Sequence, residues 1–195
     1  MPDIWIWSIA GAVIAAAAYL FYRSRSGRPV PDAIRRGRPL PEFSAIDEQG
    51  NLLRSTDMRG APAVLIFVRG NWCPFCNRQV RNLTNDYKQI VDLGAKLILV
   101  TPKPLETTRR VAEFFDVEFD FWLDESLTAT RELGLLFEGA VPADYRKEYG
   151  EDTMWPTSIV IDAAGIIRYV ELSKHIIDRP NPKTLLREVQ RAIES

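Results

Sequence analysis

The apolar positions from residue 63 to residue 100 form two continuous runs with a helical pattern between them. Ala63–Val68 and Lys96–Val100 are apolar nearly throughout, which predicts two strands, the second of them buried and parallel. The segment between them, from about Cys73 to Ile90, has apolar residues at three- and four-residue spacing, which is typical of an amphipathic helix. These positions are Val80, Leu83, Tyr87 and Ile90. The pattern therefore predicts a strand, a helix and a second strand in succession.

Further along the chain, strands and helices continue to alternate. We expect a helix over Thr107–Phe115, a short strand over Phe119–Leu123, and a short helix over Ser126–Leu133 that Gly134 ends. Residues 138–152 are polar and mixed in character, which predicts an insertion or a lid.

The last predicted elements are a hairpin and a helix. Ser158–Ile161 and Ile166–Val170 are expected to pair around a turn at residues 162–165. Thr184 is expected to cap a final helix with its apolar face formed by Leu185, Leu186, Val189 and Ile193. Another turn, over residues 48–51, joins two short strands early in the domain. The pattern predicts an α/β domain with a central mixed sheet and helices on both faces.

A stretch of nineteen residues without charge, residues 4–22, precedes this domain. As a helix it spans about 28 Å, close to the hydrocarbon thickness of a bilayer. Tryptophans mark one end and tyrosines the other, as interfacial aromatic residues do. A cleaved signal peptide is the alternative, but no basic stretch comes before the apolar core. We expect residues 1–22 to form a transmembrane anchor in contact with the bilayer.

Charge predicts the orientation of this anchor. Residues 23–40 form a linker rich in arginine and proline, and the positive-inside rule places this side in the cytoplasm. The domain over residues 41–195 is therefore expected in the cytoplasm, where thiols are normally reduced. After Arg38 the chain carries 19 basic and 24 acidic residues, a net charge of −5. This balance argues against nucleic acid as a partner.

The two cysteines of the chain, Cys73 and Cys76, come directly after the first predicted strand. Cys73 is expected at the start of the following helix, where free amides and the helix dipole stabilise a thiolate. Its pKa is then expected below the ordinary value of about 8.5. Arg69 and Arg78 flank the turn and supply auxiliary positive charge.

Other roles for the cysteine pair are less well supported. A structural disulfide would close a very short loop and constrain the unfolded chain little. A metal site needs about four ligands, and the chain adds only His175, which is expected to be structural or exposed. Inert, buried cysteines are the remaining alternative. We expect no metal and no cofactor.

Several motifs together resemble the thioredoxin-like superfamily, most closely its peroxiredoxin-related alkyl hydroperoxide reductase/thiol-specific antioxidant branch. The resemblance extends from about Pro41 to Ile193 and rests on residues 41–44, 47–50, 67–76, 123–126, 134–135 and 155–162. It implies a thioredoxin-like fold in which a cis-proline, here Pro156, lies opposite the cysteine turn. With Trp155 and Thr157, it would bind the sulfur-bearing backbone of a partner. An ordinary trans proline at the start of a strand is the alternative.

The sequence departs from this family at the positions that activate a peroxide in peroxiredoxins. Those proteins carry Thr or Ser three residues before the peroxidatic cysteine and a proline four residues further back. Counted from Cys73, these positions hold Gly70 and Ile66; counted from Cys76, they hold Cys73 and Arg69. Peroxiredoxins also place an arginine where Pro156 stands. The features of a dithiol–disulfide exchanger, in contrast, are present.

Thiol–disulfide exchange is therefore the leading hypothesis for function. Cys73, expected to be the more exposed cysteine, attacks a disulfide of a protein or small molecule, and Cys76 resolves the mixed disulfide. Trp72, Pro74 and Phe75 are expected to border the substrate, the two aromatic rings as an apolar docking patch. A thiol of unknown identity would supply electrons.

Two other functions remain open. One is an antioxidant peroxidase that reduces hydroperoxides through a Cys73 sulfenic acid, with a polar pocket formed by Arg69 and Asn71. The other is a membrane-tethered redox sensor without enzymatic activity.

Overall fold

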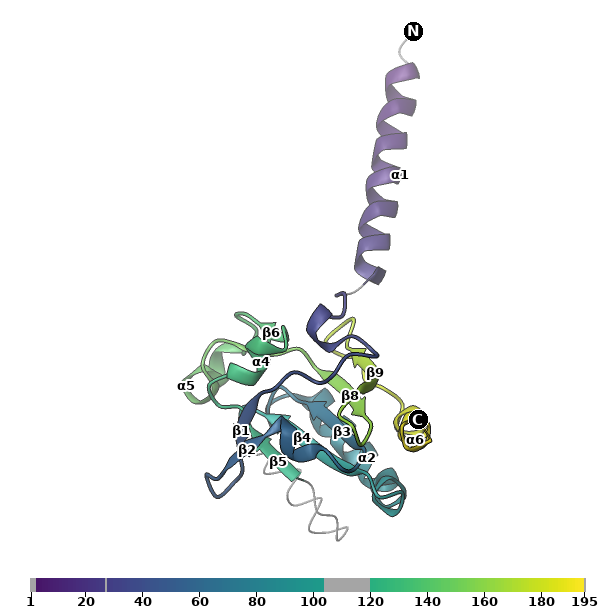
Figure 1. Cartoon of the computed structure of the whole chain (residues 1–195). Coiled ribbons are helices and arrows are strands. Elements are labelled where there is room, and N and C mark those ends of the chain that lie inside the picture. Colours follow the sequence, from purple (N-terminus) through teal and green to yellow (C-terminus); the bar gives the residue numbers. More distant parts are fainter. Residues whose placement is uncertain (1–2, 27, 104–119, 195) are drawn as a thin grey trace.

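The computed structural model describes residues 3–26, 28–103 and 120–194 of the chain (Figure 1). Its centre is a seven-stranded mixed sheet with the order β2-β1-β5-β4-β3-β8-β9. The strands are β1 (Ser44–Ile46), β2 (Leu52–Arg54), β3 (Ala63–Phe67), β4 (Lys96–Thr101), β5 (Asp120–Leu123), β8 (Thr157–Ile161) and β9 (Ile167–Leu172). β3, β4 and β5 are parallel, and β8 pairs antiparallel with β3. The predicted strands and the mixed sheet are confirmed.

Among the described residues, two helices cover one face of this sheet. α2 (Pro74–Asp92) and α6 (Pro182–Ile193) pack against each other and bury an apolar cluster with alternate residues of β3 and β4. On α2 the predicted positions Val80, Leu83 and Ile90 are buried, which confirms the helical spacing. All five residues of β3 are buried, as expected for a strand with both faces covered.

Short elements cover the opposite face. They are α4 (Thr128–Glu132) and the 3₁₀ turns η1 (Asp32–Ile34) and η2 (Ser55–Met58). Their apolar side chains and those of nearby loops form a second cluster against the sheet. The expectation of a helix over Thr107–Phe115 falls outside the described residues.

The start of α6 differs from the prediction. Asn181, rather than Thr184, is the N-cap, and its side chain accepts a hydrogen bond from the Lys183 amide. Pro182 then occupies the first helical position, where its fixed φ and missing N–H suit a helix start. Of the residues predicted to form the inner face of this helix, Leu185 and Val189 are buried, whereas Ile193 is 45% exposed.

Part of the predicted linker packs onto the domain. Ile34 is fully buried, and the amides of Gly37 and Leu40 donate to the carbonyls of Ile167 and Gly165. Arg28 donates to the Gly134 carbonyl. The packed part of the chain thus begins by Arg28, within the segment predicted as a linker.

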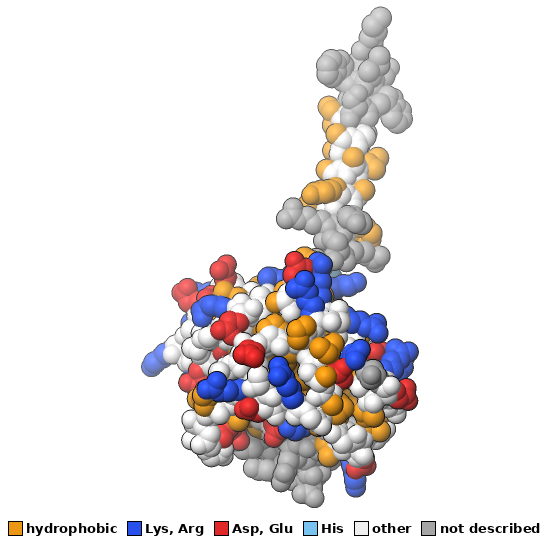
Figure 2. Space-filling model, in the orientation of Figure 1, with side chains coloured by type: hydrophobic (Ala, Val, Ile, Leu, Met, Phe, Trp, Pro, Cys, Tyr) orange, Lys and Arg blue, Asp and Glu red, His pale blue; other side chains and the backbone are white. Residues whose placement is uncertain are grey.

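The first helix, α1 (Asp3–Ser26), extends away from the domain (Figure 1). Figure 2 shows apolar side chains along it, whereas basic and acidic side chains intermingle on the domain face in view. In the part of the chain that the structure describes, no helix combines the length and apolar character needed to cross a membrane. The transmembrane prediction for residues 4–22 is therefore not confirmed.

Residues 138–152, called the cover segment below, form a folded excursion from the sheet. They contain η3 (Ala143–Tyr145) and α5 (Arg146–Tyr149). Two short antiparallel strands, β6 (Leu136–Phe137) and β7 (Thr153–Met154), close the base of the excursion. The predicted insertion is thus a compact substructure that packs near the cysteine turn.

Candidate active site

Cys73 is the N-cap of α2, at the position that the helical spacing predicts. β3 ends at Phe67, and a tight loop through Gly70 leads from it to Cys73. Pro74 follows in the first turn, and the backbone amide of Cys76 donates to Cys73 Sγ over 3.4 Å. The sulfur therefore accepts from a main-chain amide of the first helical turn, which favours the thiolate.

The two sulfur atoms lie 2.6 Å apart, with the Cys76 thiol placed to donate to Cys73 Sγ. This hydrogen bond lowers the pKa of Cys73 to about 6, although burial opposes the shift; the Cys76 amide and the charges of Arg179 and Arg69 lower it further. Burial and the neighbouring Cys73 raise the pKa of Cys76. Near neutral pH one proton is thus held on Cys76 and Cys73 is the thiolate.

Both cysteines are buried, with exposed fractions of 1% for Cys73 and 0% for Cys76. Cys73 is thus the more exposed of the two only by this small margin, and neither sulfur is open to solvent. Both sulfurs belong to the apolar cluster under α2, and Trp72 and Phe75 pack against that cluster. A bulky substrate reaches Cys73 only if some of this packing opens.

Arg179 is the functional residue that sequence reasoning missed. Its Nη2 lies 3.2 Å from Cys76 Sγ and 3.8 Å from Cys73 Sγ. Its Nη1 donates to the carbonyls of Ile176 and Asp178, 2.8 and 2.5 Å away, which hold the guanidinium in place. Since the loop before α6 contacts the cysteine turn across more than 100 residues of sequence, no local pattern pointed to it.

The two arginines that the sequence did indicate have different surroundings. Arg69 is buried, donates to the Ala140 carbonyl at 2.5 Å, and stacks on the Trp72 ring with its guanidinium carbon 4.5 Å from the ring centroid. Burial lowers the pKa of Arg69, and the nearby cysteines raise it. Arg78 is exposed on α2, and the structure places neither sulfur within hydrogen-bonding distance of it. Arg69 and Arg179 therefore supply the positive charge at the thiolate.

Trp72 faces the cover segment. Its ring stacks on Tyr145 at 6.0 Å between centroids and meets Tyr149 edge-on at 6.4 Å. The Tyr149 hydroxyl donates to Asn71 Oδ1 over 2.6 Å, and burial raises its pKa. Pro74 is exposed and Phe75 is half-buried beside the sulfurs. Of the three residues expected to border the substrate, Pro74 is thus exposed, whereas Trp72 and Phe75 are both half-buried.

Pro156 lies directly before β8, whose first residue, Thr157, pairs with Phe67 at the end of β3. The described backbone contains no cis peptide bond, so the cis-proline expectation is wrong. A proline fits the start of a strand in the trans form, which is lower in energy by about 0.5–1 kcal/mol. Trp155 stacks on Phe137 at 4.0 Å, and the Thr157 hydroxyl donates to the Trp155 carbonyl. Substrate binding by residues 155–157 stays a prediction.

His175 is exposed, and its backbone amide donates to the Asp178 carboxylate. This agrees with the expected surface position.

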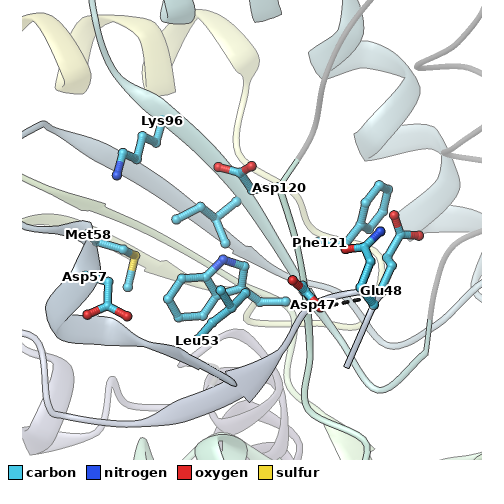
Figure 3. Close-up of a pocket in the computed structure, with 11 residues that line it drawn as sticks. Asp47, Glu48, Leu53, Asp57, Met58, Lys96, Asp120 and Phe121 are labelled. Carbon is cyan, nitrogen blue, oxygen red and sulfur yellow. Dashed lines mark hydrogen bonds between the residues drawn. The ribbon is translucent and has the colours of Figure 1, made fainter. Parts of the chain in front are cut away.

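A separate pocket of about 360 Å³ lies at the opposite end of the parallel strands (Figure 3). Lys96, at the start of β4, lines it together with the carboxyl-bearing residues Asp47, Glu48, Asp57 and Asp120. Because Lys96 pairs with Ala63 at the beginning of β3, and the cysteines follow the end of β3, this pocket is not part of the thiol site.

The sequence model of the AhpC/TSA family matches residues 36–170 of this chain. Peroxiredoxin Q from Oryza sativa subsp. japonica is 23% identical over 144 residues, covering 73% of this chain and 61% of that protein. Thiol-disulfide oxidoreductase ResA from Bacillus subtilis (strain 168) is 25% identical over 125 residues, covering 54% of this chain and 68% of ResA. The chain thus spans about three fifths of the length of the peroxiredoxin Q proteins that it matches.

The fold is shared with peroxidoxin BcpB from Mycobacterium tuberculosis. The TM-score is 0.63 at 17% identity, and the match covers 81% of this chain and 97% of that one. The fold is accordingly the thioredoxin-like fold of peroxiredoxins.

Proposed function

This oxidoreductase belongs to the AhpC/TSA family, and we propose that it carries out thiol–disulfide exchange with Cys73 as the nucleophile and Cys76 as the resolving thiol. The observation that carries the proposal is the pair of sulfurs 2.6 Å apart at a helix start, with a guanidinium beside both. Fold alone does not determine activity. The proposal therefore rests on the site.

The exchange proceeds in two steps. The Cys73 thiolate attacks one sulfur of a substrate disulfide, forms a mixed disulfide, and releases the other half as a thiolate that takes a proton from solvent. Cys76 then loses its proton, attacks Cys73 Sγ, and releases the second half. Two protein thiols are oxidised to one disulfide while the substrate gains two electrons and two protons.

Arg179 supports both steps of this cycle. Its positive charge stabilises the Cys73 thiolate before attack, and its shorter contact is to Cys76 Sγ. When Cys76 gives up its proton, the same guanidinium is in place to stabilise the new negative charge. An external thiol returns the pair to the reduced form.

Hydroperoxide reduction is the second candidate, and the burial of Cys73 favours it. A sulfur that is 1% exposed between two arginines is more accessible to a small oxidant than to a protein disulfide. Cys73 would take one peroxide oxygen to become a sulfenic acid, releasing an alcohol. Cys76 would then condense with it, forming the disulfide and water.

Rapid mixing distinguishes these candidates. Reduced protein is mixed with 2-hydroxyethyl disulfide or with hydrogen peroxide, and the change in tryptophan fluorescence, to which Trp72 beside the redox pair contributes, reports oxidation. We expect faster oxidation by the disulfide, and a stable mixed disulfide at Cys73 in Cys76→Ser. Faster oxidation by peroxide would favour the peroxidase, and no reaction beyond that of free cysteine would favour a sensor without enzymatic activity.

We also propose that residues 4–22 attach the domain to a membrane, with the domain on the cytoplasmic side. The support comes from sequence alone, namely the charge-free stretch and the arginines after it. Extraction of membranes with alkaline carbonate should leave the full chain in the pellet and release a chain that starts at residue 28. Release of both chains would contradict the anchor.

A further inference from the structure

A small cavity lies beside the redox pair, between α2 and the loop that leads into α6. It measures about 150 Å³ and is lined by Phe75, Arg78, Gln79, Ile177, Arg179 and Pro182, among others. We propose that this cavity binds the carboxylate groups of a low-molecular-weight disulfide and thereby selects anionic small disulfides as substrates. The inference rests on the exchange reaction proposed above.

Two arginines give the cavity its positive charge. Arg78 is exposed on α2 and forms no ion pair with the residues that the structure describes. Arg179 uses Nη1 and Nη2 to contact carbonyls and sulfurs, but its buried Nε has no hydrogen-bond partner among the described residues. The nearby Asp178 carboxylate accepts from the His175 amide. A carboxylate is the group that two such guanidinium side chains recognise.

Gln79 lines the same cavity through a side-chain amide. Its side chain is only 5% exposed, and its Nε2 makes a 3.4 Å hydrogen bond to Ser158 Oγ. Its Oε1 is buried without a partner among the described residues. Buried polar atoms in folded proteins are nearly always paired. The donor Arg179 Nε, unpaired among the described residues, suits a carboxylate, which only accepts hydrogen bonds, whereas the acceptor Gln79 Oε1 cannot pair with one.

The remaining walls suit the carbon chain of such a ligand. Phe75 is half-buried, Ile177 is 60% exposed, and two prolines complete the lining. A cavity of about 150 Å³ has room for a short carboxyalkyl arm but not for a folded protein. The partner is therefore a small molecule with an apolar stem and an anionic end.

Arg179 connects the cavity to the chemistry. The guanidinium that lines the cavity also lies 3.8 Å from Cys73 Sγ. A ligand whose carboxylate is held in the cavity has its disulfide close to the redox pair, and it reaches the buried Cys73 thiolate once the packing of Phe75 opens. Attack then forms the Cys73 mixed disulfide and releases one thiol, and Cys76 releases the second by forming the internal disulfide. No other oxidant or reductant is needed for a single turnover.

Three disulfides that differ mainly in charge test this inference. Single-turnover oxidation of the reduced full chain is measured with 3,3′-dithiodipropionate, neutral 2-hydroxyethyl disulfide and dicationic cystamine. We expect the dianion to react about tenfold faster than the neutral compound and cystamine to react more slowly. Arg78→Ala should lower the ratio of dianion to neutral rates by about fivefold, and Arg78→Glu should reverse the preference toward cystamine. Arg81→Ala removes the same charge from an exposed position of α2 outside the cavity, and it should leave the ratio unchanged.

The possible results separate this inference from the proposed exchange. Equal rates for the three disulfides, or equal effects of Arg78→Ala and Arg81→Ala, would overturn the cavity as a carboxylate site and leave exchange intact. Failure of every disulfide to react, with rapid oxidation by hydrogen peroxide, would overturn both.

Discussion

Arg179 joins the cysteine turn to the loop before α6 through contacts with both sulfurs. Its position has an electrostatic consequence, because a fixed positive charge beside a buried sulfur favours the thiolate. The carbonyls of Ile176 and Asp178 hold it there. The reactivity of Cys73 therefore depends on a side chain outside the Cys-x-x-Cys motif.

Replacement of Arg179 should raise the pKa of Cys73 toward its ordinary value of about 8.5. In Arg179→Gln the thiolate fraction at pH 7 falls, so alkylation by iodoacetamide at that pH should slow about twofold, as for a pKa rise of about one unit. Arg179→Lys keeps the charge and should recover part of the rate. Arg187→Gln, at an exposed position of α6, is the matched control. An unchanged alkylation rate in Arg179→Gln would show that this guanidinium does not stabilise the thiolate.

Local residue chemistry was largely predictable, and long-range contacts were not. The position of Cys73 at a helix start followed from apolar spacing within about twenty residues, and the structure confirms it. The burial of Cys73, the role of Arg179 and the trans form of Pro156 depend on segments that meet only in the folded chain. Sequence periodicity carries no information about contacts between segments that are distant in the sequence.

Gly70 shapes the loop that brings Cys73 to the start of α2. Its φ is +131°, and a Cβ there would lie 2.8 Å from Tyr149 Cε1 and 2.9 Å from Trp72 Nε1. Gly70→Ala should therefore reduce the free energy of unfolding by about 2–3 kcal/mol and change the alkylation rate of Cys73. Gly94→Ala has a positive φ of +77° but open space around the added methyl group. In urea unfolding it should cost only about 1 kcal/mol; equal losses in the two variants would show that crowding at Gly70 is unimportant.

At the scale of elements, apolar runs and spacing predicted the strands and α2 because each reflects burial on a regular period. The cap of α6 was mispredicted because Thr184 and Asn181 are both good capping residues. Pro182, which suits the first helical position, favours Asn181. The compact cover segment was recognised only as an insertion, since its polar sequence has no period. Its packing on Trp72 is a tertiary contact.

The cap of α6 is also connected to the active site. Asn181 lies two residues after Arg179, so loss of its side-chain hydrogen bond should loosen the loop that carries the guanidinium. Asn181→Ala should lower the free energy of unfolding by about 1 kcal/mol and slow alkylation of Cys73. Thr184→Ala should change both quantities much less. If Thr184→Ala had the larger effect in urea unfolding, the assignment of the cap would be wrong.

At the scale of the whole molecule, the domain includes a segment that charge and proline content had marked as a linker. Composition alone does not reveal this packing. Ile34 is buried by residues of the second apolar cluster, which come from distant parts of the sequence. The segment also adds backbone hydrogen bonds to the loop around Gly165 and Ile167. The mixed sheet, in contrast, followed from the alternation of elements.

Truncation tests this extension of the domain. A chain of residues 28–195 should retain the stability of the full chain, whereas a chain of residues 41–195 should lose about 2–5 kcal/mol with the burial of Ile34 and its neighbours. Urea unfolding followed by circular dichroism measures both, and Ile34→Ala in the longer chain gives the single-residue share. Equal stability of the two truncated chains would contradict the packing of residues 28–40.

The proposed chemistry depends above all on the ionisation of Cys73 in the reduced protein. Cys73 has a lowered pKa, so its alkylation rate should rise as pH increases through about 6 and then level off, since the thiolate is the reactive form. Stopped-flow alkylation by iodoacetamide from pH 4.5 to pH 9.5, with the modified residue identified by mass spectrometry, gives this profile. A midpoint close to 6 at Cys73, with Cys76 unmodified, is the expected result. A midpoint near the ordinary thiol value of about 8.5, or first modification at Cys76, would contradict it.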